Sequence, residues 1–172
     1  MSEVTIHKCT PEDAVIVRAI LRETWLDSYT DFIPLEDILW YLDNHYPTHQ
    51  LLKMFEDPDN FFYVAEYDKT ECGLLRCRIN PSEKMFYVSS LYVLPGFQGL
   101  HVGSILLKRA YELAGEKGFN EVWLGVMNKN VKSLEWYKKS GFVFPVEEPF
   151  KMGNTVVNHL IGYKTLGPQN QK

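Results

Sequence analysis

The chain has 172 residues, of which 45% are hydrophobic and 14% aromatic, which is enough for one domain with a sizeable core. Its net charge of −4 has the wrong sign for a general nucleic-acid binder, and no apolar stretch reaches the ~18 residues of a membrane span. The N-terminus has no basic start followed by an apolar block, and three cysteines make an odd number. We therefore expect one domain over residues 1–172 with a loose tail at 165–172, reduced thiols and a cytoplasmic location.

Charge is unevenly distributed along the chain. Residues 1–60 carry 12 acids and 4 bases, net −8, whereas residues 61–172 carry 10 acids and 14 bases, net +4. Between Arg22 and Lys53 there is no Lys or Arg, but there are six acids. Such a stretch is either the solvated face of helices or an anionic surface suited to a cationic ligand, and both interpretations stay open here.

The first sixty residues predict one strand followed by helices. Residues 4–8 are β-prone, and residues 10–13 (TPED) combine a capping threonine, a first-turn proline and an acid three residues on, which marks a helix start. A second helix begins at Pro34 and is broken by Pro47, after which residues 51–55 add a short further turn.

From residue 60 the spacing of apolar residues changes from helical to strand-like. FFYVAEY, CGLLRCRI and MFYVSSLYVL predict three strands joined by tight turns, hence an antiparallel meander. A helix to about residue 117, a strand over 120–127, a helix over 131–140 and a closing hairpin around 152–154 follow. Because residues 86–127 form a βαβ unit, the predicted fold is α/β (α+β), with a mixed, mostly antiparallel sheet of about seven strands, about four helices and one parallel pair.

Residues 95–107, PGFQGLHVGSILL, join a predicted strand to a predicted helix. The unpaired N–H groups of a helix's first turn can hold a phosphate, and Gly99 and Gly103 permit a close backbone approach. The stretch has neither G-x-G-x-x-G nor G-K-[ST], so it is neither the dinucleotide fingerprint nor the triphosphate loop. Taken alone, its spacing favours a plain loop over an anion cradle.

A second motif about 25 residues later makes the pattern specific. LYVLPGFQGLHVGSILL followed by NKNVKSLEWYKKSGF resembles the GNAT superfamily of acetyl-CoA-dependent N-acetyltransferases, in which [QR]-x-x-G-x-[GA] opens a helix and N-x-x-[AS]-x-x-[LFW]-Y-x-K-x-G-F follows the next strand. The matching positions are Gln98, Val102, Gly103, Asn130, Ser133, Trp136, Tyr137, Lys139, Gly141 and Phe142. The resemblance spans residues 2–165 and, within the superfamily, is most similar to the PaiA-type spermidine/spermine acetyltransferases of bacteria.

The resemblance implies direct transfer of acetyl from the cosubstrate acetyl-CoA to a primary amine, without a metal. It implies that Tyr137 is the general acid that protonates the leaving thiolate, although packing on a helix is the commoner fate of a tyrosine. It also implies a cofactor-binding set made of the last residues of one strand, the glycine-bearing loop and the second motif. The set is Leu91, Tyr92, Val93, Gln98, Gly99, Leu100, His101, Val102, Gly103, Ser104, Asn130, Ser133 and Lys139.

His101 occupies the position where the family usually has glycine. A side chain is tolerated there if the backbone stays at negative φ and the imidazole points outward, because the phosphate contact is made by the N–H group. Whether His101 helps or hinders CoA binding stays open.

The acceptor is predicted to be a polyamine such as spermidine or spermine, since the acidic stretch suits a polycation. The predicted substrate-binding residues are Asp27, Tyr29, Asp31 and Glu36. Many relatives have a glutamate as general base on the strand before the loop, where this chain has Ser89 and Ser90. We therefore hypothesise that a water chain carries the ammonium proton to one of the three substrate-binding acids.

Several alternatives stay open at this stage. The acceptor could be another small amine or a protein N-terminus, or the chain could be a non-catalytic CoA-binding sensor. His45 and His49 have the i, i+4 spacing of metal ligands, but Pro47 interrupts the helix that would align them. The expected partner is a small-molecule amine, with no nucleic acid and no membrane, and a homodimer is left open.

Overall fold

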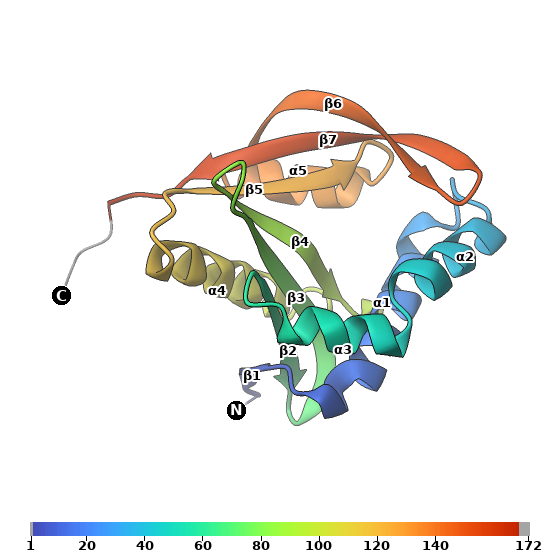
Figure 1. The fold of residues 1–172 in the computed structure, drawn as a ribbon, viewed down its shortest axis with the longest axis horizontal. Helices are drawn as coiled ribbons and strands as arrows, with labels where there is room; N and C mark the ends of the chain where they lie inside the picture. Colours follow the sequence, from blue (N-terminus) through green and yellow to red (C-terminus); the bar gives the residue numbers. More distant parts are fainter. Residues whose placement is uncertain (1, 169–172) are drawn as a thin grey trace.

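The computed structural model describes residues 2–168, which form a seven-stranded sheet between two groups of helices (Figure 1). The strand order is β1-β2-β3-β4-β5-β7-β6, and β4–β5 is the parallel pair in an otherwise antiparallel sheet. The predicted mixed α/β fold is therefore confirmed. Within residues 2–168, no helix has the length and apolar character needed to cross a membrane.

The elements follow the predicted order, with one addition. They are β1 (Val4–Lys8), α1 (Ala14–Tyr29), α2 (Leu35–His45), α3 (Thr48–Glu56), β2 (Asn60–Tyr67), β3 (Thr70–Asn80), β4 (Met85–Val93), α4 (Val102–Glu116), β5 (Glu121–Met127), α5 (Val131–Lys139), β6 (Val143–Met152) and β7 (Thr155–Thr165). Short 3₁₀ turns precede α1 and α4. The turn expected after Pro47 is the helix α3, which gives the described residues five α-helices instead of about four. Leu51 explains its stability, because this side chain is fully buried.

The helix start predicted at residues 10–13 forms through local hydrogen bonds. The Thr10 backbone N–H donates to the Asp13 carboxylate at 2.8 Å, and the Asp13 N–H donates to the Thr10 carbonyl at 3.0 Å. These bonds satisfy groups that the first turn would otherwise leave unpaired. The chain then enters α1 with Val17, Leu21 and Trp25 buried against the sheet.

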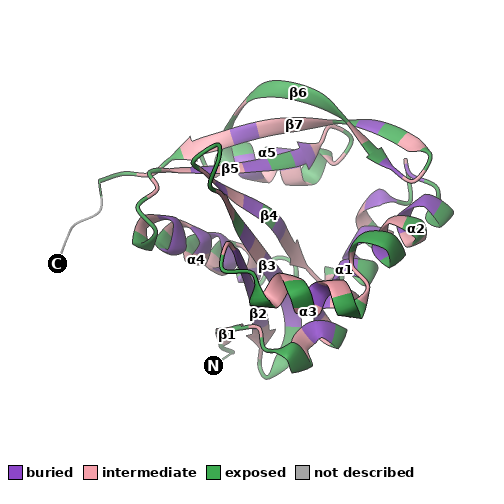
Figure 2. Cartoon of the chain, in the orientation of Figure 1, coloured by how far each residue is buried: buried purple, intermediate pink, exposed green. Residues whose placement is uncertain are grey.

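The core lies on both faces of the central strands. Leu74 and Leu75 are adjacent on β3 and fully buried, but they point to opposite faces because side chains alternate along a strand. One face is covered by α4 and α5 and the other by α1, α2 and α3, whereas β6 is mostly exposed (Figure 2). Each such leucine contributes about 1.5–3 kcal/mol by burial. The sheet is thus a rigid base between two cores.

The cysteines and the C-terminal segment behave largely as predicted. All three cysteines are free, and Cys72 and Cys77 are fully buried. The predicted tail begins in the last residue of β7, and the Leu166 N–H donates to the Asn120 carbonyl at 2.7 Å, so the chain stays attached beyond the strand. Residues 169–172 of the predicted tail lie outside the described residues.

Candidate active site

The parallel strands β4 and β5 separate soon after they meet. Within the described residues they pair only at Tyr87 and Trp123, and Figure 1 shows them diverging beyond that point. A β-bulge contributes to the divergence: Arg76 of β3 pairs with Ser90, and Cys77 pairs with Val88, which leaves Ser89 as the extra residue. A bulge bends its strand and increases its twist, so the last residues of β4 turn away from β5.

A cleft of about 490 Å³ opens where the two strands separate. It is lined by β4 and β5, by one side of α1, by the start of α5 and by the β6–β7 hairpin. Eight of the predicted site residues line it, namely Tyr29, Leu91, Tyr92, Val93, Gln98, Asn130, Ser133 and Tyr137. Sequence motifs more than 30 residues apart therefore meet at one place in the sheet.

The start of α5 explains how the second motif reaches the cleft. Asn130 is the N-cap residue, and its Oδ1 accepts a hydrogen bond from the Ser133 N–H at 3.4 Å. Its own N–H donates to the Met127 carbonyl at 2.9 Å, which ties the cap to the end of β5. Asn130, Ser133 and Tyr137 then share one helix face, as their spacing predicts, and that face borders the cleft.

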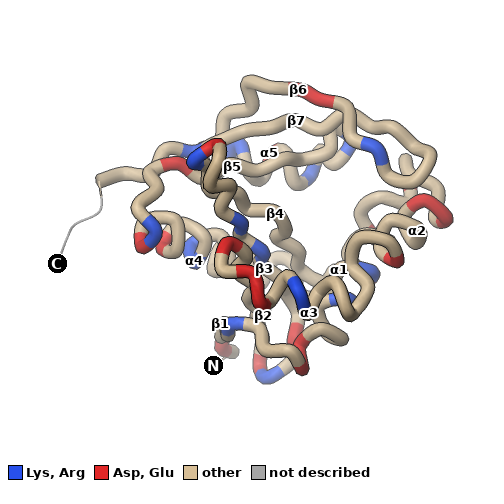
Figure 3. The backbone as a smooth tube through the Cα atoms, in the orientation of Figure 1, with Lys and Arg blue, Asp and Glu red and all other residues tan. Residues whose placement is uncertain are grey.

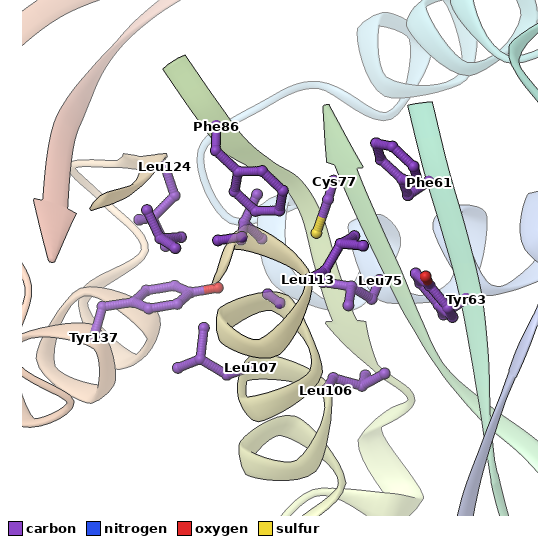
Figure 4. Close-up of a cluster of buried hydrophobic side chains, with 14 of the residues drawn as sticks. Phe61, Tyr63, Leu75, Cys77, Phe86, Leu106, Leu107, Leu113, Leu124 and Tyr137 are labelled. Atoms are coloured by element: carbon purple, nitrogen blue, oxygen red, sulfur yellow. The ribbon is translucent and has the colours of Figure 1, made fainter. Parts of the chain in front are cut away.

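Tyr137 combines deep burial with contact to the cleft. Its side chain extends from α5 into the buried cluster that contains Leu107 and Leu124 (Figure 4). Burial, and to a lesser extent Tyr29 and Tyr111, raises the pKa of its phenol well above the usual value near 10. The phenol is therefore protonated at neutral pH, as a proton donor must be. The raised pKa of Tyr137 also lies further above the pKa of the CoA thiol than the pKa of an ordinary tyrosine does. The Tyr137 phenol is therefore a weaker acid than an exposed tyrosine would be.

The loop between β4 and α4 is held through the side chain of Gln98. Gln98 Nε2 donates to the Val93 carbonyl at 3.3 Å, and Lys132 Nζ of α5 donates to Gln98 Oε1 at 2.7 Å. The first helical bond of α4 runs from the Ile105 N–H to the His101 carbonyl at 3.1 Å, so the N–H groups before Ile105 precede the helical ladder. These donors, the helix dipole and the Lys132 charge fit an anion such as a diphosphate. Sequence reasoning missed Lys132, which the family motif leaves variable.

The structure does not meet the condition that His101 keep a negative φ. His101 has φ +64° and Gly99 has φ +81°, both in the left-handed region. The chain has to reverse its direction between the 3₁₀ turn at Pro95–Phe97 and the first turn of α4, and two left-handed residues accomplish this. The family's glycine suits this conformation, and a histidine adopts it at a cost of roughly 1–2 kcal/mol. The imidazole is exposed, as the second condition requires.

Some predicted site residues lie away from the cleft. Lys139 is the last residue of α5, at the opposite end from Asn130. Asp27 and Asp31 are exposed and do not line the cleft, and Glu36 lines a second cavity of about 700 Å³. The loop positions in the cofactor-binding set that do not line the cleft continue directly from Gln98, which does; they are Gly99, Leu100, His101, Val102, Gly103 and Ser104.

The structure adds cleft residues that no motif indicated. They come from the α2 region, β3, β6 and β7, and they are Tyr41, Tyr46, Arg76, Arg78, Phe150 and His159. For the arginines a signal existed, because alternation along CGLLRCRI places residues 74, 76 and 78 on one face of β3. The other residues had none, since they are distant in sequence and meet only in the folded chain.

His159 of β7 has an unusual environment in this cleft. Its Nδ1 is buried and has no hydrogen-bond partner among the residues that the structure describes. Burial lowers the pKa of the imidazole, and the nearby Glu148 carboxylate opposes this shift in part. The imidazole is consequently neutral at neutral pH and able to accept a proton.

Asp37 of α2 connects the helices to the β6–β7 hairpin that closes the cleft. Its carboxylate accepts hydrogen bonds from the Asn154 N–H at 2.9 Å and from the Thr155 hydroxyl. These two bonds lower the pKa of Asp37, that from Asn154 most strongly. A Cβ at Gly153 would lie 2.3 Å from the Asp37 carboxylate, so only glycine allows this contact without a shift.

Within residues 2–168, His45 and His49 do not belong to any group of three or more His, Cys, Asp or Glu side chains that could hold a metal. The His45 ring instead stacks on Tyr41, with ring centroids 3.9 Å apart.

Comparison with known proteins places this site in a family. The model of the acetyltransferase (GNAT) family matches residues 18–142, which run from α1 to the end of α5. The chain belongs to this family and is therefore an N-acetyltransferase, one class of acyltransferase. The glycine-bearing loop, helix α4 after it and the capped helix α5 all lie inside the matched region.

Individual relatives agree with this assignment. The chain is 26% identical over 141 residues to an uncharacterized N-acetyltransferase of Mycobacterium bovis, a match that covers 82% of this chain and 90% of the relative. PaiA N-acetyltransferase from Thermoplasma acidophilum, solved in complex with coenzyme A, has a TM-score of 0.81 at 24% identity, covering 95% of this chain and 99% of that one. The yncA protein of Salmonella typhimurium, solved with its cofactor acetyl-CoA, has a TM-score of 0.73 at 20% identity. This match covers 99% of this chain and 98% of the yncA chain. At these identities the two structures show a shared fold.

Proposed function

We propose that this protein transfers the acetyl group of acetyl-CoA directly to a primary amine bound in the cleft. The observation that carries the proposal is that one cleft joins two places in the fold. Tyr137 and Asn130 line it where β4 and β5 separate, and Gln98 lines it on the loop that leads into α4. In the reaction the amine nitrogen attacks the thioester carbonyl, the C–N bond forms and the C–S bond breaks. The ammonium must lose one proton before the attack, and its nitrogen loses a second one as the amide forms. The leaving thiolate takes one proton, so one proton is released overall.

The donor side of the cleft would hold acetyl-CoA through backbone groups. The Leu94 N–H donates to the Cys72 carbonyl on the β3 side, so by alternation the N–H groups of Leu91 and Val93 face the gap that the bulge opens. They can donate to the acetyl oxygen as negative charge develops. The first turn of α4, with Lys132 close to Gln98, suits the diphosphate. Asn130 and Ser133 would contact the CoA arm. The CoA and acetyl-CoA named for the two structural neighbours support this placement.

Transfer is direct because the thiols are poorly suited to carry an acetyl group. Cys72 and Cys77 are fully buried, and burial together with Asp13 raises the pKa of Cys9 to about 12. A thiol of that pKa is almost entirely protonated at neutral pH, whereas the thiolate is the nucleophile. Tyr137 would return a proton to the leaving CoA thiolate.

His159 is the best-placed group to remove the ammonium proton. An alkylammonium with a pKa near ~10.4 costs about 4.6 kcal/mol to deprotonate at pH 7, at about 1.36 kcal/mol per pKa unit. A neutral imidazole inside the cleft can take this proton. The water chain to Asp27, Asp31 or Glu36 stays a hypothesis, and it requires a longer path because none of these acids lines the cleft.

A polyamine acceptor is the narrower alternative. It is supported by the acids of residues 23–43 and by the likeness to PaiA, and Figure 3 shows acidic segments on α1 and α2. These acids would have to act from outside the cleft. Charge reversal at both Asp31 and Glu36 should then raise KM for spermidine more than KM for a monoamine, and an equal effect on both amines would count against a polyamine site.

The general proposal is tested by incubating the protein with acetyl-CoA and a panel of primary amines. We expect thiol release that depends on the amine, no burst of thiol without amine, and an acetylated product identified by mass spectrometry. Tight binding of acetyl-CoA without thiol release from any amine would favour a non-catalytic CoA-binding sensor.

A further inference from the structure

The charges in the cleft point to the class of acceptor. The cleft is lined by two arginines, Arg76 and Arg78, and none of its described lining residues is Asp or Glu. Both arginines lie on the central strand β3, where Figure 3 shows basic segments. We propose that the acceptor amine also carries a carboxylate, which binds the Arg76 guanidinium while the amine faces the bulge of β4. This inference rests on the acetyltransferase function proposed above and specifies its substrate.

Arg76 is held in position before any acceptor binds. Its Nε donates to Asn60 Oδ1 at 3.0 Å, its Nη1 donates to the Tyr46 hydroxyl at 3.3 Å, and its guanidinium carbon lies 5.4 Å from the centroid of the Phe62 ring. A half-buried, fixed side chain loses little further conformational entropy on binding a ligand. The site is therefore preorganised.

Arg76 also has donors to spare and no internal counter-ion. An arginine has five N–H donors, and two of them are used by Asn60 and Tyr46, which leaves three without a partner among the described residues. Within residues 2–168 no Asp or Glu side chain forms an ion pair with Arg76. A half-buried guanidinium of this kind favours an anionic partner, and a carboxylate matches its planar geometry.

The position of Arg76 relates the carboxylate to the reaction. Arg76 pairs with Ser90, next to the extra residue of the β4 bulge, so it lies beside the point where β4 leaves β5. Tyr41, Tyr46 and Phe150 line the same cleft and would pack against the carbons between the two ends of the acceptor. An amine end near the bulge and a carboxylate end at Arg76 fit one extended molecule.

Arg78 and the acids at the outer rim play a smaller part. Arg78 is exposed, with its guanidinium carbon 5.9 Å from the Tyr87 ring centroid, and the Tyr87 hydroxyl donates to Glu83 at 3.3 Å. Glu148 pairs with His159 in the β6–β7 register. Burial raises the Tyr87 pKa most, and Glu83 and then Glu148 add to this rise. These acids offset Arg78, so Arg76 is the principal anion anchor.

The test compares three acceptors of equal length, pentylamine, 5-aminopentanoate and 1,5-diaminopentane, and repeats the comparison with chains from three to six carbons. We expect kcat/KM to be highest for the aminocarboxylate and lowest for the diamine. Arg76→Gln should raise KM for the aminocarboxylate about 10- to 100-fold, the range for a hydrogen-bonded charge, and leave KM for the alkylamine unchanged. Arg76→Lys should rescue only part of this loss, because it keeps the charge without the planar fork.

Two controls separate the possible failures. Arg22→Gln removes an exposed arginine of α1 outside the cleft and should change none of these values. If Arg76→Gln weakened all three amines equally, its role would be structural and the inference would be overturned, as it would if the diamine were the best acceptor. Calorimetric titration of the acetyl-CoA-free protein with 5-aminopentanoate is independent of turnover. Binding that requires Arg76 would support the inference even if the transfer reaction failed, and absence of binding would refute it.

Discussion

The two sides of the cleft are built in different ways. The donor side consists of β4, the loop, α4, β5 and the start of α5, which follow one another between residues 85 and 139. The acceptor side combines α1, Tyr41, Tyr46, Arg76, Phe150 and His159, which are scattered from residue 24 to residue 161. In the proposed reaction the donor side would bind acetyl-CoA through backbone groups and helix ends, whereas the acceptor side presents side chains. Two local motifs can therefore specify the first, while only the assembled fold defines the second.

The largest expected effect comes from the donor side. Tyr137→Phe should lower kcat about 10²- to 10⁴-fold, the usual contribution of a general acid, with little change in the affinity for acetyl-CoA. Tyr67→Phe is a matched control, because Tyr67 packs half-buried against the same core cluster, does not line the cleft and does not affect the Tyr137 pKa. Steady-state kinetics and calorimetry would check both variants, and an unchanged kcat for Tyr137→Phe would remove it from the acid role.

On the acceptor side, His159→Gln should lower kcat/KM about a hundredfold at neutral pH. In the wild type, kcat/KM should fall as the pH drops through the lowered His159 pKa and reach a plateau above it. In the variant it should keep rising with pH toward the pKa of the amine, near ~10.4, because free amine would then be required. His49→Gln changes an exposed histidine outside the cleft and should retain the wild-type profile. Identical profiles for wild type and His159→Gln would exclude His159 as the base.

Asp37→Asn should affect substrate binding on the acceptor side of the cleft more than on the donor side. The carboxylate holds the β6–β7 hairpin against α2, so its loss should raise KM for the acceptor several-fold and leave KM for acetyl-CoA unchanged. Because the folded-state pKa of Asp37 is lowered, its stabilising contribution is present above the unfolded pKa near ~3.9 and is lost as the pH falls through the folded value.

Thermal unfolding at several pH values would measure this contribution, with Glu23→Gln as control because Glu23 is exposed on α1 and forms no ion pair among the described residues. An equal rise of both KM values would mean that Asp37 supports the whole cleft instead of its acceptor side.

The smallest effect is expected at the start of α4. His101→Gly should relieve the left-handed strain and increase the free energy of unfolding by at most about 1 kcal/mol, because the more flexible unfolded chain offsets part of the gain. Acetyl-CoA affinity should be unchanged or slightly higher. A loss of affinity would show instead that the imidazole contributes to binding, and chemical denaturation together with calorimetry would distinguish these results.

The sequence predicted the fold almost completely because its signals are local. Apolar spacing, Pro47 and the TPED run placed the strands and helices, and the i, i+3, i+7 spacing of Asn130, Ser133 and Tyr137 predicted their shared helix face. The local signal failed where a tertiary contact decided the outcome. Helix α3 persists because Leu51 is buried in the core, and the φ of His101 is positive because the loop must reverse between two fixed elements.

The sequence by itself determined the family and the sheet with its one parallel pair, and it predicted the residues of the donor side, since each depends on neighbours in the chain. Only the tertiary structure decided the charge of the acceptor side. The acidic stretch of residues 23–43 suggested an anionic groove, but Asp27 on α1 and Asp31 in the turn after it are exposed and do not line the cleft. Strand alternation, by contrast, points Arg76 and Arg78 into the cleft. The sign of the charge in a binding site depends on which face of each helix or strand borders the site, and packing over the whole sheet sets that face.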